Sequence, residues 1–413
     1  MNRNFTSLTV GVSLALGAFL VYSSQQTAQE ASTGLPGARP PIIAAEFSSL
    51  QAAFDALPPE GGLVRLPAGT FEITETLVIK SEDVSIQGAG TATHIKNVNE
   101  EGKPALIIAH PGHKRAGSDR GHELWRMHLA NFRLTGNEKS GHGIVAWNIN
   151  EIYLDGITVS YHGGDGIRLN HCYEDPRISD SLITYNKGTG LHLQGCHDIV
   201  VAANQFEENN DALRCIDGYN LCMTGNCLDD HLGHGVVVEN TYGSVVSGNM
   251  IEECKGTAII LDRDCYGDTV SANVIAHNGA GVDLRDAHGC TVSANTFTIL
   301  KTDAVRIGRQ SGRIVVSGNN FSNSYIGDGK VKRKPGDLAA AGLVLEETTA
   351  ALVSGNIFSA VGPIAVEVSG DDNSSVLTNN LVIDANAGIP TEEIKKTVTQ
   401  SNRSFNGQGK AGE

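Results

Sequence analysis

Three acidic residues, Glu239, Asp262 and Asp283, recur at nearly even intervals within short apolar runs. If these runs are strands that stack one coil apart, Glu239 and Asp262 lie about 5 Å apart and Asp262 and Asp283 about 8 Å apart. Close like charges favour protonation of one partner, which suits a general acid. The longer separation leaves room for the water of an inverting glycoside hydrolase. We therefore expect Glu239 as the acid and Asp262 or Asp283 as the base.

A basic group occupies equivalent runs nearer the N-terminus. A polysaccharide lyase needs a base for a sugar C–H proton and a cation that neutralises the sugar carboxylate. Arg168, His192 and Arg214 could supply both. Further substrate-binding candidates outside this group are Arg285, Arg306 and Trp147.

Two other interpretations of the same charges stay open. The acidic group could bind Ca²⁺ through its carboxylate oxygens. Alternatively, the charges pair between neighbouring strands of a solvated sheet face, Asp262 with Arg285 and Asp283 with Arg306.

The elements that must position these residues follow from an internal repeat of about 23 residues between residues 131 and 380. One motif reads Gly-x-Gly-apolar-x-apolar, as in GDGIRLN from Gly164 and GHGVVVE from Gly233. A second motif, VSGN or a variant of it, alternates with the first. Its asparagines are Asn204, Asn226, Asn249, Asn273, Asn295, Asn319, Asn356 and Asn379, and Asn131, Asp155 and Asp180 continue the register upstream.

The repeat predicts an all-β fold, a right-handed parallel β-helix with three strands per coil. Each run alternates over three to five residues, which is typical of strands, and no window has the 3.6-residue period of an α-solenoid. Asparagine tolerates the left-handed conformation of a tight turn and can form hydrogen-bonded ladders. The register predicts one buried column: Ile167, Leu191, Leu213, Val236, Ile259, Val282 and Val305.

The N-terminal part resembles the capping module of the pectate-lyase-like superfamily. Residues 48–96 contain GGLVRLPAGTF from Gly61 and IQGAG from Ile86. The resemblance implies a capping helix over Leu50–Leu57 and a polysaccharide as the partner. Known catalytic signatures do not carry over: Asp229-Asp230 and Gly233-His234-Gly235 lie only three residues apart, and no Asp-Pro-His-Asp occurs. Because Gly141-His142-Gly143 is a second copy, we interpret Gly-His-Gly as a turn element of the repeat and not as a catalytic motif.

The net charge of the chain disfavours nucleic acid as a partner, and its N-terminal segment predicts the compartment. The chain has 413 residues, 48 Gly and a net charge of −15, which disfavours nucleic acid. Arg3 followed by an apolar stretch over residues 8–22 predicts a signal peptide over residues 1–28, hence a secreted, periplasmic or cell-surface protein with no further membrane contact. Export permits disulfides, and Cys172 and Cys196 are expected to stack either as a disulfide or as buried thiols.

Aromatic residues and two insertions flank the repeats. Four tyrosines are expected in the turn after the Gly-x-Gly strand: Tyr173, Tyr219, Tyr242 and Tyr266. The insertion over residues 322–338 carries four cations that could hold an anionic sugar: Lys330, Lys332, Arg333 and Lys334. The insertion over residues 97–128 contains His110, His113 and His122, and its role cannot be inferred from sequence.

These features predict a signal peptide (1–28), a linker (29–44), a β-helix (45–385) and a C-terminal tail (386–413). The expected function is that of a monomeric hydrolase or lyase acting on an acidic polysaccharide. The alternative is a non-catalytic binding or cell-envelope scaffold. Carboxylates lining a groove would favour the enzyme, and a flat face with all charges paired would favour the scaffold.

Overall fold

The computed structural model describes residues 35–322, 341–371, 373–383, 385, 387–390 and 396–405. The chain divides into two compact units after Arg39, and the unit that begins at Pro40 contains the solenoid. The predicted signal peptide and residues 323–340, with the four cations of the basic insertion, lie outside the described residues. No helix within the described ranges is long and apolar enough to cross a membrane.

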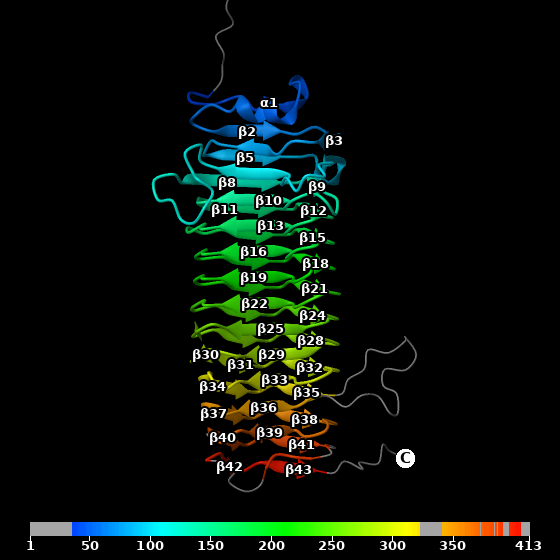
Figure 1. Ribbon diagram of the computed structural model, residues 1–413, viewed down its shortest axis with the longest axis vertical. Helices are drawn as coiled ribbons and strands as arrows, with labels where there is room; N and C mark the ends of the chain where they lie inside the picture. The colour runs from blue at the N-terminus through cyan, green and yellow to red at the C-terminus, as the bar shows by residue number, and fades with distance from the viewer. Residues whose placement is uncertain are drawn as a thin grey trace, which may run out of the picture. The chain divides into compact units, whose positions relative to one another are not determined.

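The solenoid is built from three parallel sheets that run along its axis (Figure 1). The first sheet contains the Gly-x-Gly strands: β4 (Leu77–Ile79), β7 (Leu106–Ala109), β10 (Ile144–Trp147), β13 (Ile167–Asn170), β16 (Leu191–Gln194), β19 (Leu213–Ile216), β22 (Val236–Glu239), β25 (Thr257–Asp262), β29 (Ala280–Leu284), β33 (Val305–Ile307), β36 (Leu343–Glu346) and β39 (Val366–Ser369).

The second sheet follows the first along each coil and ends at the asparagine turn. Its strands are β1 (Ile42–Ile43), β2 (Gly62–Arg65), β5 (Val84–Gln87), β8 (Leu124–Ala130), β11 (Ile149–Asp155), β14 (Arg177–Ser179), β17 (Val200–Ala202), β20 (Cys222–Thr224), β23 (Val245–Ser247), β26 (Cys265–Tyr266), β27 (Thr269–Ser271), β30 (Ala287–His288), β31 (Thr291–Ser293), β34 (Gly312–Ser317), β37 (Thr349–Ser354), β40 (Ser374–Thr378) and β42 (Val398–Gln400).

The third sheet closes the coil between the asparagine turn and the next first-sheet strand. Its strands are β3 (Gly69–Ile73), β6 (Thr93–Asn97), β9 (Arg133–Thr135), β12 (Thr158–Ser160), β15 (Leu182–Thr184), β18 (Gln205–Glu207), β21 (Cys227–Asp229), β24 (Met250–Glu252), β28 (Val274–Ala276), β32 (Thr296–Thr298), β35 (Asn320–Ser322), β38 (Ile357–Ser359), β41 (Leu381–Ile383) and β43 (Arg403–Phe405). Short 3-10 turns occupy Ala44–Glu46 and Gly90–Ala92.

The predicted buried column is confirmed. Strand pairing joins Ile167 to Leu191 and continues in register through Val236 and Ile259 to Val305. Every member of the column is buried, at 0 or 1% exposure. The sequence therefore places the core residue of these seven first-sheet strands correctly.

We expected each asparagine both to take the left-handed conformation and to form the ladder. In the structure, two consecutive residues share these roles. The residue before each ladder asparagine has positive φ, for example Ala203 at 57° and Gly248 at 71°. The asparagine then bonds along the axis: Asn226 Nδ2 donates to Oδ1 of Asn249 at 2.9 Å and to the Val201 carbonyl at 3.1 Å. Such bonds satisfy backbone groups that would otherwise be buried without partners.

The C-terminal register of this ladder needs one correction. Asn356 bonds to Asn380, not to the predicted Asn379, and Asn380 bonds to Asn402. Asn379 takes the left-handed position with φ of 55°. In the same way, Asn131 and Asp180 are left-handed residues and not ladder members, and Ser181 bonds to Asn204 instead.

A second polar ladder lies at the turn after the third sheet. Asn186 Nδ2 donates to Oδ1 of Asn209 at 2.9 Å, and the Asn209 amide donates to the Ile183 carbonyl at 2.8 Å. His162 and His231 occupy equivalent positions and are fully buried. Burial lowers the pKa of each imidazole to about 4, against weaker opposition from backbone carbonyls.

The predicted ends of the solenoid are both displaced. β1 pairs with β2 inside the expected linker, and β42 and β43 pair with β40 and β41 beyond residue 385. Helix α1 (Leu50–Asp55) falls in the range predicted for the capping helix. Its buried Ala53 and Phe54 belong to the core, and the Gln51 side chain bonds to the Val78 backbone.

All eight cysteines are free in the structure, so the thiol alternative describes Cys172 and Cys196. Both are completely buried. Cys196 Sγ lies 3.5 Å from the Leu169 carbonyl, and burial raises the pKa of this thiol well above its usual value.

Candidate functional site

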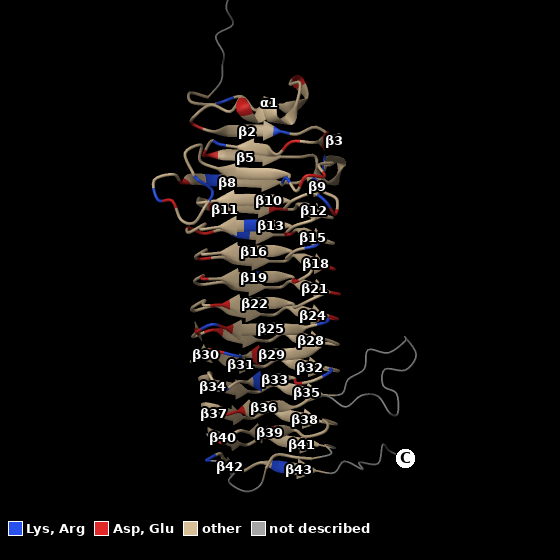
Figure 2. Cartoon of the chain, in the orientation of Figure 1, with Lys and Arg blue, Asp and Glu red and all other residues tan. Residues whose placement is uncertain are grey.

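The outer face of the first sheet holds the predicted site residues in the expected columns. Arg168 pairs with His192 and His192 with Arg214, on β13, β16 and β19. Glu239 and Asp262 are direct neighbours on β22 and β25. Figure 2 shows charged residues on several strands of this sheet.

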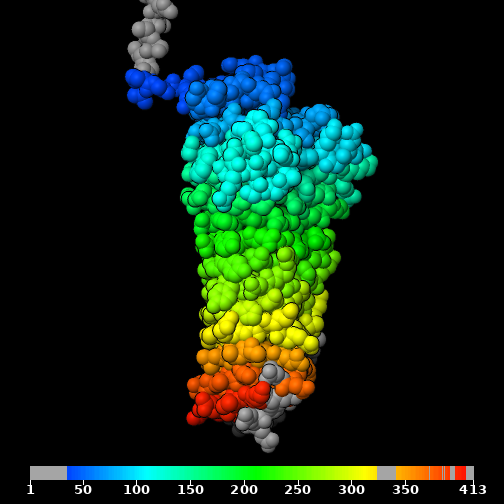
Figure 3. All heavy atoms as spheres, turned by 60° about the vertical axis from the view of Figure 1, so that its left-hand side comes forward, coloured from blue at the N-terminus to red at the C-terminus, as the bar shows by residue number. Residues whose placement is uncertain are grey.

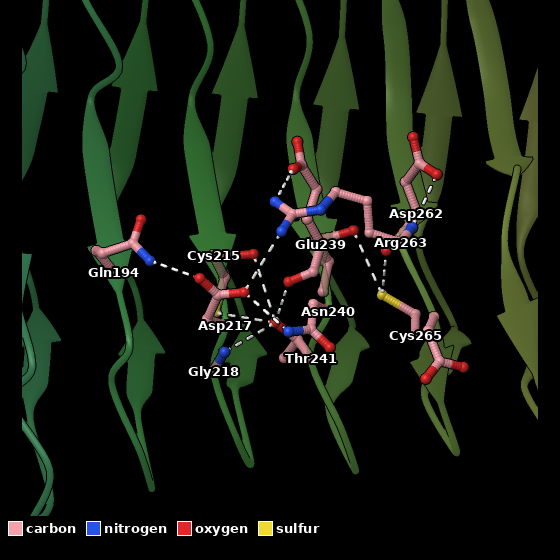
Figure 4. A network of polar contacts seen from close by, with 12 residues as sticks. Gln194, Cys215, Asp217, Gly218, Glu239, Asn240, Thr241, Asp262, Arg263 and Cys265 are labelled. Carbon is pink, nitrogen blue, oxygen red and sulfur yellow. Dashed lines mark hydrogen bonds and ion pairs between the residues drawn. The ribbon is translucent and has the colours of Figure 1, made fainter.

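Two arginines, Arg214 and Arg263, hold the Glu239 carboxylate. Arg214 Nη2 donates to Oε1 at 2.6 Å. Arg263 Nη1 donates to Oε2 at 2.9 Å, as Figure 4 shows. The Glu239 side chain is only 16% exposed. Because both oxygens accept from guanidinium donors, this carboxylate is poorly placed to give a proton to a sugar oxygen.

Arg285 joins the other two acidic candidates. Its Nε donates to Asp283 Oδ2 at 2.8 Å, and its Nη1 lies 3.8 Å from Asp262 Oδ2. The expected pair of Asp262 with Arg285 is therefore present. The expected pair of Asp283 with Arg306 is wrong, because Arg306 bonds to Asp303 at 2.6 Å and to Glu346 at 3.1 Å.

Asp165, which the sequence did not single out, organises the basic group. Its Oδ2 lies 3.1 Å from Arg168 Nη1 and 3.5 Å from His192 Nδ1. Burial alone would raise the pKa of Asp165, but hydrogen bonding to His192, the charge of His142 and the Thr189 N–H lower it from 3.8 to about 2. The aspartate thus stays ionised between an arginine and two histidines.

His192 is the central member of the basic group. Its side chain is 13% exposed, and Nε2 is buried without a hydrogen-bond partner. His192 Nδ1 lies between Asp165 Oδ2 at 3.5 Å and Arg168 Nη1 at 3.4 Å. In the tautomer that carries its proton on Nδ1, the imidazole donates to Asp165 and the Nε2 lone pair is free. His192 thus has the arrangement of a base that is oriented by a carboxylate.

A repeated Asp-x-x-Arg pattern is the sequence signal that would have revealed Asp165. Within three of the Gly-x-Gly strands the arginine bonds to an aspartate three residues earlier, in the pairs Asp165 with Arg168, Asp211 with Arg214 and Asp303 with Arg306. The second oxygen of Asp165 and of Asp211 accepts a backbone N–H of the next coil, at 2.9 and 2.7 Å. Each of these two aspartates therefore holds the arginine of its own coil and also bonds to the backbone of the next coil.

The Gly-His-Gly interpretation is supported by matching contacts. His142 Nδ1 accepts the Asp165 N–H at 2.8 Å, and His234 Nδ1 accepts the Thr257 N–H at 3.0 Å. Both histidines connect successive coils in the same way.

An aromatic ladder follows the turn between the first and second sheets. It contains the four predicted tyrosines and adds His197 between Tyr173 and Tyr219, at ring distances of 4.8 and 4.6 Å. Tyr219 stacks on Tyr242 at 5.5 Å, and bridges continue to Tyr266. Because Tyr219 and Tyr242 stack on each other, one face of each ring is covered.

The insertion over residues 97–128 sends a loop along the start of this ladder. His113 packs against Trp147 with ring centroids 5.6 Å apart, and its Nε2 lies 3.1 Å from Asn148 Oδ1. The loop projects from one side of the solenoid in Figure 1 and faces the viewer as the central cyan surface in Figure 3. Trp147, one of the predicted substrate-binding residues, is therefore partly covered by His113.

The groups of described residues that could hold a metal do not include Glu239, Asp262 or Asp283. Among the described residues, ligand atoms converge within 4.8 Å in three groups: Glu252, Glu253 and His277; Asp264, Asp286 and His288; and Asp229, Asp230 and Glu253. The predicted Ca²⁺ ligands instead have arginine partners.

The family model described as right handed beta helix region matches residues 142–297 and 261–412, together more than half of the chain. The protein belongs to this family, and its solenoid is a right-handed parallel β-helix, as predicted. No curated protein sequence matches the chain.

Solved structures share the fold at low identity. The A-module of the mannuronan C-5 epimerase AlgE6 of Azotobacter vinelandii has a TM-score of 0.58 and 14% identity, covering 89% of this chain and 100% of that one. AlyGC, a PL6 family alginate lyase, has a TM-score of 0.61 and 12% identity, covering 88% of this chain and 53% of its own. PfbA, a surface adhesin of Streptococcus pneumoniae, has a TM-score of 0.53 and 10% identity, covering 84% and 91%.

Proposed function

We propose that this protein acts on an acidic polysaccharide as a lyase, with Arg168, His192 and Arg214 as its reactive group. The observation that carries the proposal is the position of His192. It stands between two arginines in one outward column, with Nδ1 directed to Asp165 and Nε2 unpartnered. The lyase alternative is favoured over the hydrolase because Glu239, Asp262 and Asp283 each have an arginine partner.

The chemistry assigns one role to each group. An arginine neutralises the uronate carboxylate, which makes the adjacent C5–H acidic enough for removal. His192 Nε2 takes this proton, and Asp165 stabilises the imidazolium. The electron pair forms the C4–C5 double bond as the C4–O bond breaks, and the released oxygen takes a proton from water. Arg168 and Arg214 lie one coil, about 4.8 Å, on either side of the base.

Access to His192 requires a local rearrangement. Its Nε2 is buried, whereas the Arg168 and Arg214 side chains are 30% and 29% exposed. A carboxylate that draws either guanidinium outward would compete with its aspartate partner and uncover the imidazole. We further propose that this happens outside the cytoplasm, since the first residues have the pattern of a signal peptide.

The second candidate function is a non-catalytic polysaccharide-binding scaffold. The observation that favours it is the continuous chain of ion pairs from Arg214 through Glu239 and Arg263, and from Asp262 through Arg285 to Asp283. Such a face holds its charges without any catalytic requirement.

A panel of uronate-containing polysaccharides separates the possibilities when ultraviolet absorbance of unsaturated products and reducing ends are measured together. A lyase produces both signals, and His192→Gln should reduce them by at least about a hundredfold with the fold intact. Asp283→Asn is the matched control and should keep most of the activity. Reducing ends without absorbance, lost in the Asp283 variant, would instead establish a hydrolase. Binding without any product would favour the scaffold.

A further inference from the structure

One face of the solenoid differs from the rest of this acidic protein in having no charge. We call it the uncharged face: the outward residues of the second sheet from β17 to β40, the asparagine turn beside them and the first residue of each adjoining third-sheet strand. β17, β20, β23, β27, β31, β37 and β40 contain no Lys, Arg, Asp or Glu. Among the second-sheet strands from β17 to β40, the exception is Arg313, near the start of β34.

Two outward columns of small or apolar side chains form the second-sheet part of the uncharged face. Strand pairing aligns Val200, Cys222, Val245, Thr269, Thr291 and Val315 in one column. The other column contains Thr224, Ser247, Ser271, Ser293, Ser317 and Ser354. These side chains present methyl and hydroxyl groups of similar height along consecutive coils.

Exposed aliphatic residues gather on the same face. Six that are 36 to 44% exposed lie in or directly beside it: Val200, Val245, Val274, Leu352, Ile357 and Val398. A contiguous exposed apolar surface of this kind marks an interaction site more often than isolated exposed residues do.

The left-handed residues of the asparagine turn have small side chains, although their conformation alone does not require small residues. Its left-handed residues are Ala203, Gly225, Gly248, Ala272, Ala294 and Gly318. At the turn after the third sheet, the same left-handed conformation is taken by Glu208, Asp230, Glu253 and His277. Positive φ therefore tolerates large charged residues in this solenoid, and alanine has no conformational advantage over them. The small residues at the asparagine turn therefore keep this surface flat, because no long side chain projects from it.

We infer that the uncharged face binds a second copy of this chain, with the two second sheets packed face to face across a two-fold axis. With coils about 4.8 Å apart and residues about 3.3 Å apart, the face measures about 35–40 Å by 15–20 Å, on the order of 600–800 Å². This approaches the roughly 800 Å² that each partner contributes to a standard interface. A net charge of −15 opposes contact elsewhere, whereas this face adds no repulsion. The inference is independent of the proposed enzyme activity and revises the expected monomer.

The test uses the solution mass of the full chain, measured by light scattering during gel filtration. Ser271 lies near the middle of the face, so Ser271→Lys places two like charges close together in a dry two-fold interface and should halve the measured mass. Thr302→Lys adds the same charge at an exposed residue of another turn and should leave the dimer intact. Circular dichroism verifies that both variants fold.

A native probe gives a second readout. Cys222 is the exposed cysteine of the uncharged face, and a bulky maleimide on its thiol should also produce monomers. A wild-type protein that stays monomeric at the highest attainable concentration would overturn the inference. So would a Ser271→Lys variant with the wild-type mass. A monomer that sediments with an insoluble polysaccharide through this face would likewise overturn it and identify a polymer surface as the partner.

Discussion

Two buried histidines should make the stability of this solenoid depend on pH, and His231 offers the sharper test. The His231 imidazole is fully buried, Nδ1 lies 3.4 Å from the Asn209 carbonyl, and Nε2 has no partner. Burial lowers its pKa from 6.5 to about 4. Because the unfolded chain binds a proton in this interval and the folded chain does not, stability is complete above pH 6.5 and falls as the pH decreases towards 4.

The magnitude follows from the size of this pKa change. A decrease from 6.5 to about 4 corresponds to roughly 3 kcal/mol for one residue at pH 4. His162, whose pKa is also lowered to about 4, contributes a similar loss. Asp268 opposes both, because burial raises its pKa to about 6, and its protonation stabilises the fold as the pH falls below 6. A single substitution isolates the His231 contribution from these others.

His231→Asn is the informative substitution, since asparagine fills equivalent ladder positions at Asn186, Asn209 and Asn278. We expect little change in the free energy of unfolding at pH 7.5 and a stabilisation of roughly 2–3 kcal/mol at pH 4.5. Guanidinium denaturation followed by far-ultraviolet circular dichroism measures both values. Thr302→Asn, at an exposed residue that does not titrate, is the control and should show the same difference at both pH values.

The reasoning is refuted if His231→Asn changes stability equally at the two pH values. That result would mean that the folded protein accommodates a proton on this imidazole, through water or a local opening. A loss of several kcal/mol at pH 7.5 would instead mean that packing of the ring matters more than its titration.

Three further outcomes are expected. Ile259→Asp should abolish folding, because an unpaired charge enters a dry core, and a variant that keeps the wild-type circular dichroism would contradict the core assignment. Glu239→Gln should cost less than about tenfold in rate on a confirmed substrate, since Arg214 and Arg263 hold its carboxylate; a loss of about a hundredfold would restore Glu239 as the acid. Neutralising the cations of residues 330–334 should weaken binding of a polyanion and flatten its salt dependence, whereas unchanged affinity would remove this insertion from the site.

The sequence predicted the fold and strand register well because both depend on local, repeated signals. Gly-x-Gly and VSGN fix where each strand begins, so inward residues such as Ile167 and Ile259 could be assigned one coil at a time. Prediction from the sequence failed where a side chain reaches from one coil to another. Arg263, at a turn, bends back to Glu239, and Arg306 chooses Asp303 and Glu346 over Asp283. Residue spacing defines columns but not the rotamers of long side chains.

The asparagine ladder has a consequence for how this molecule can change its size. Each ladder bond joins only adjacent coils, as between Asn226 and Asn249 or between Asn249 and Asn273. A closed barrel has a circumference that fixes its number of strands, whereas this stack has no such closure. Duplication or excision of one whole coil between equivalent asparagines would reproduce the ladder bonds at the junction. Length is therefore a free variable for this architecture, and gene segments of one period are its natural unit of change.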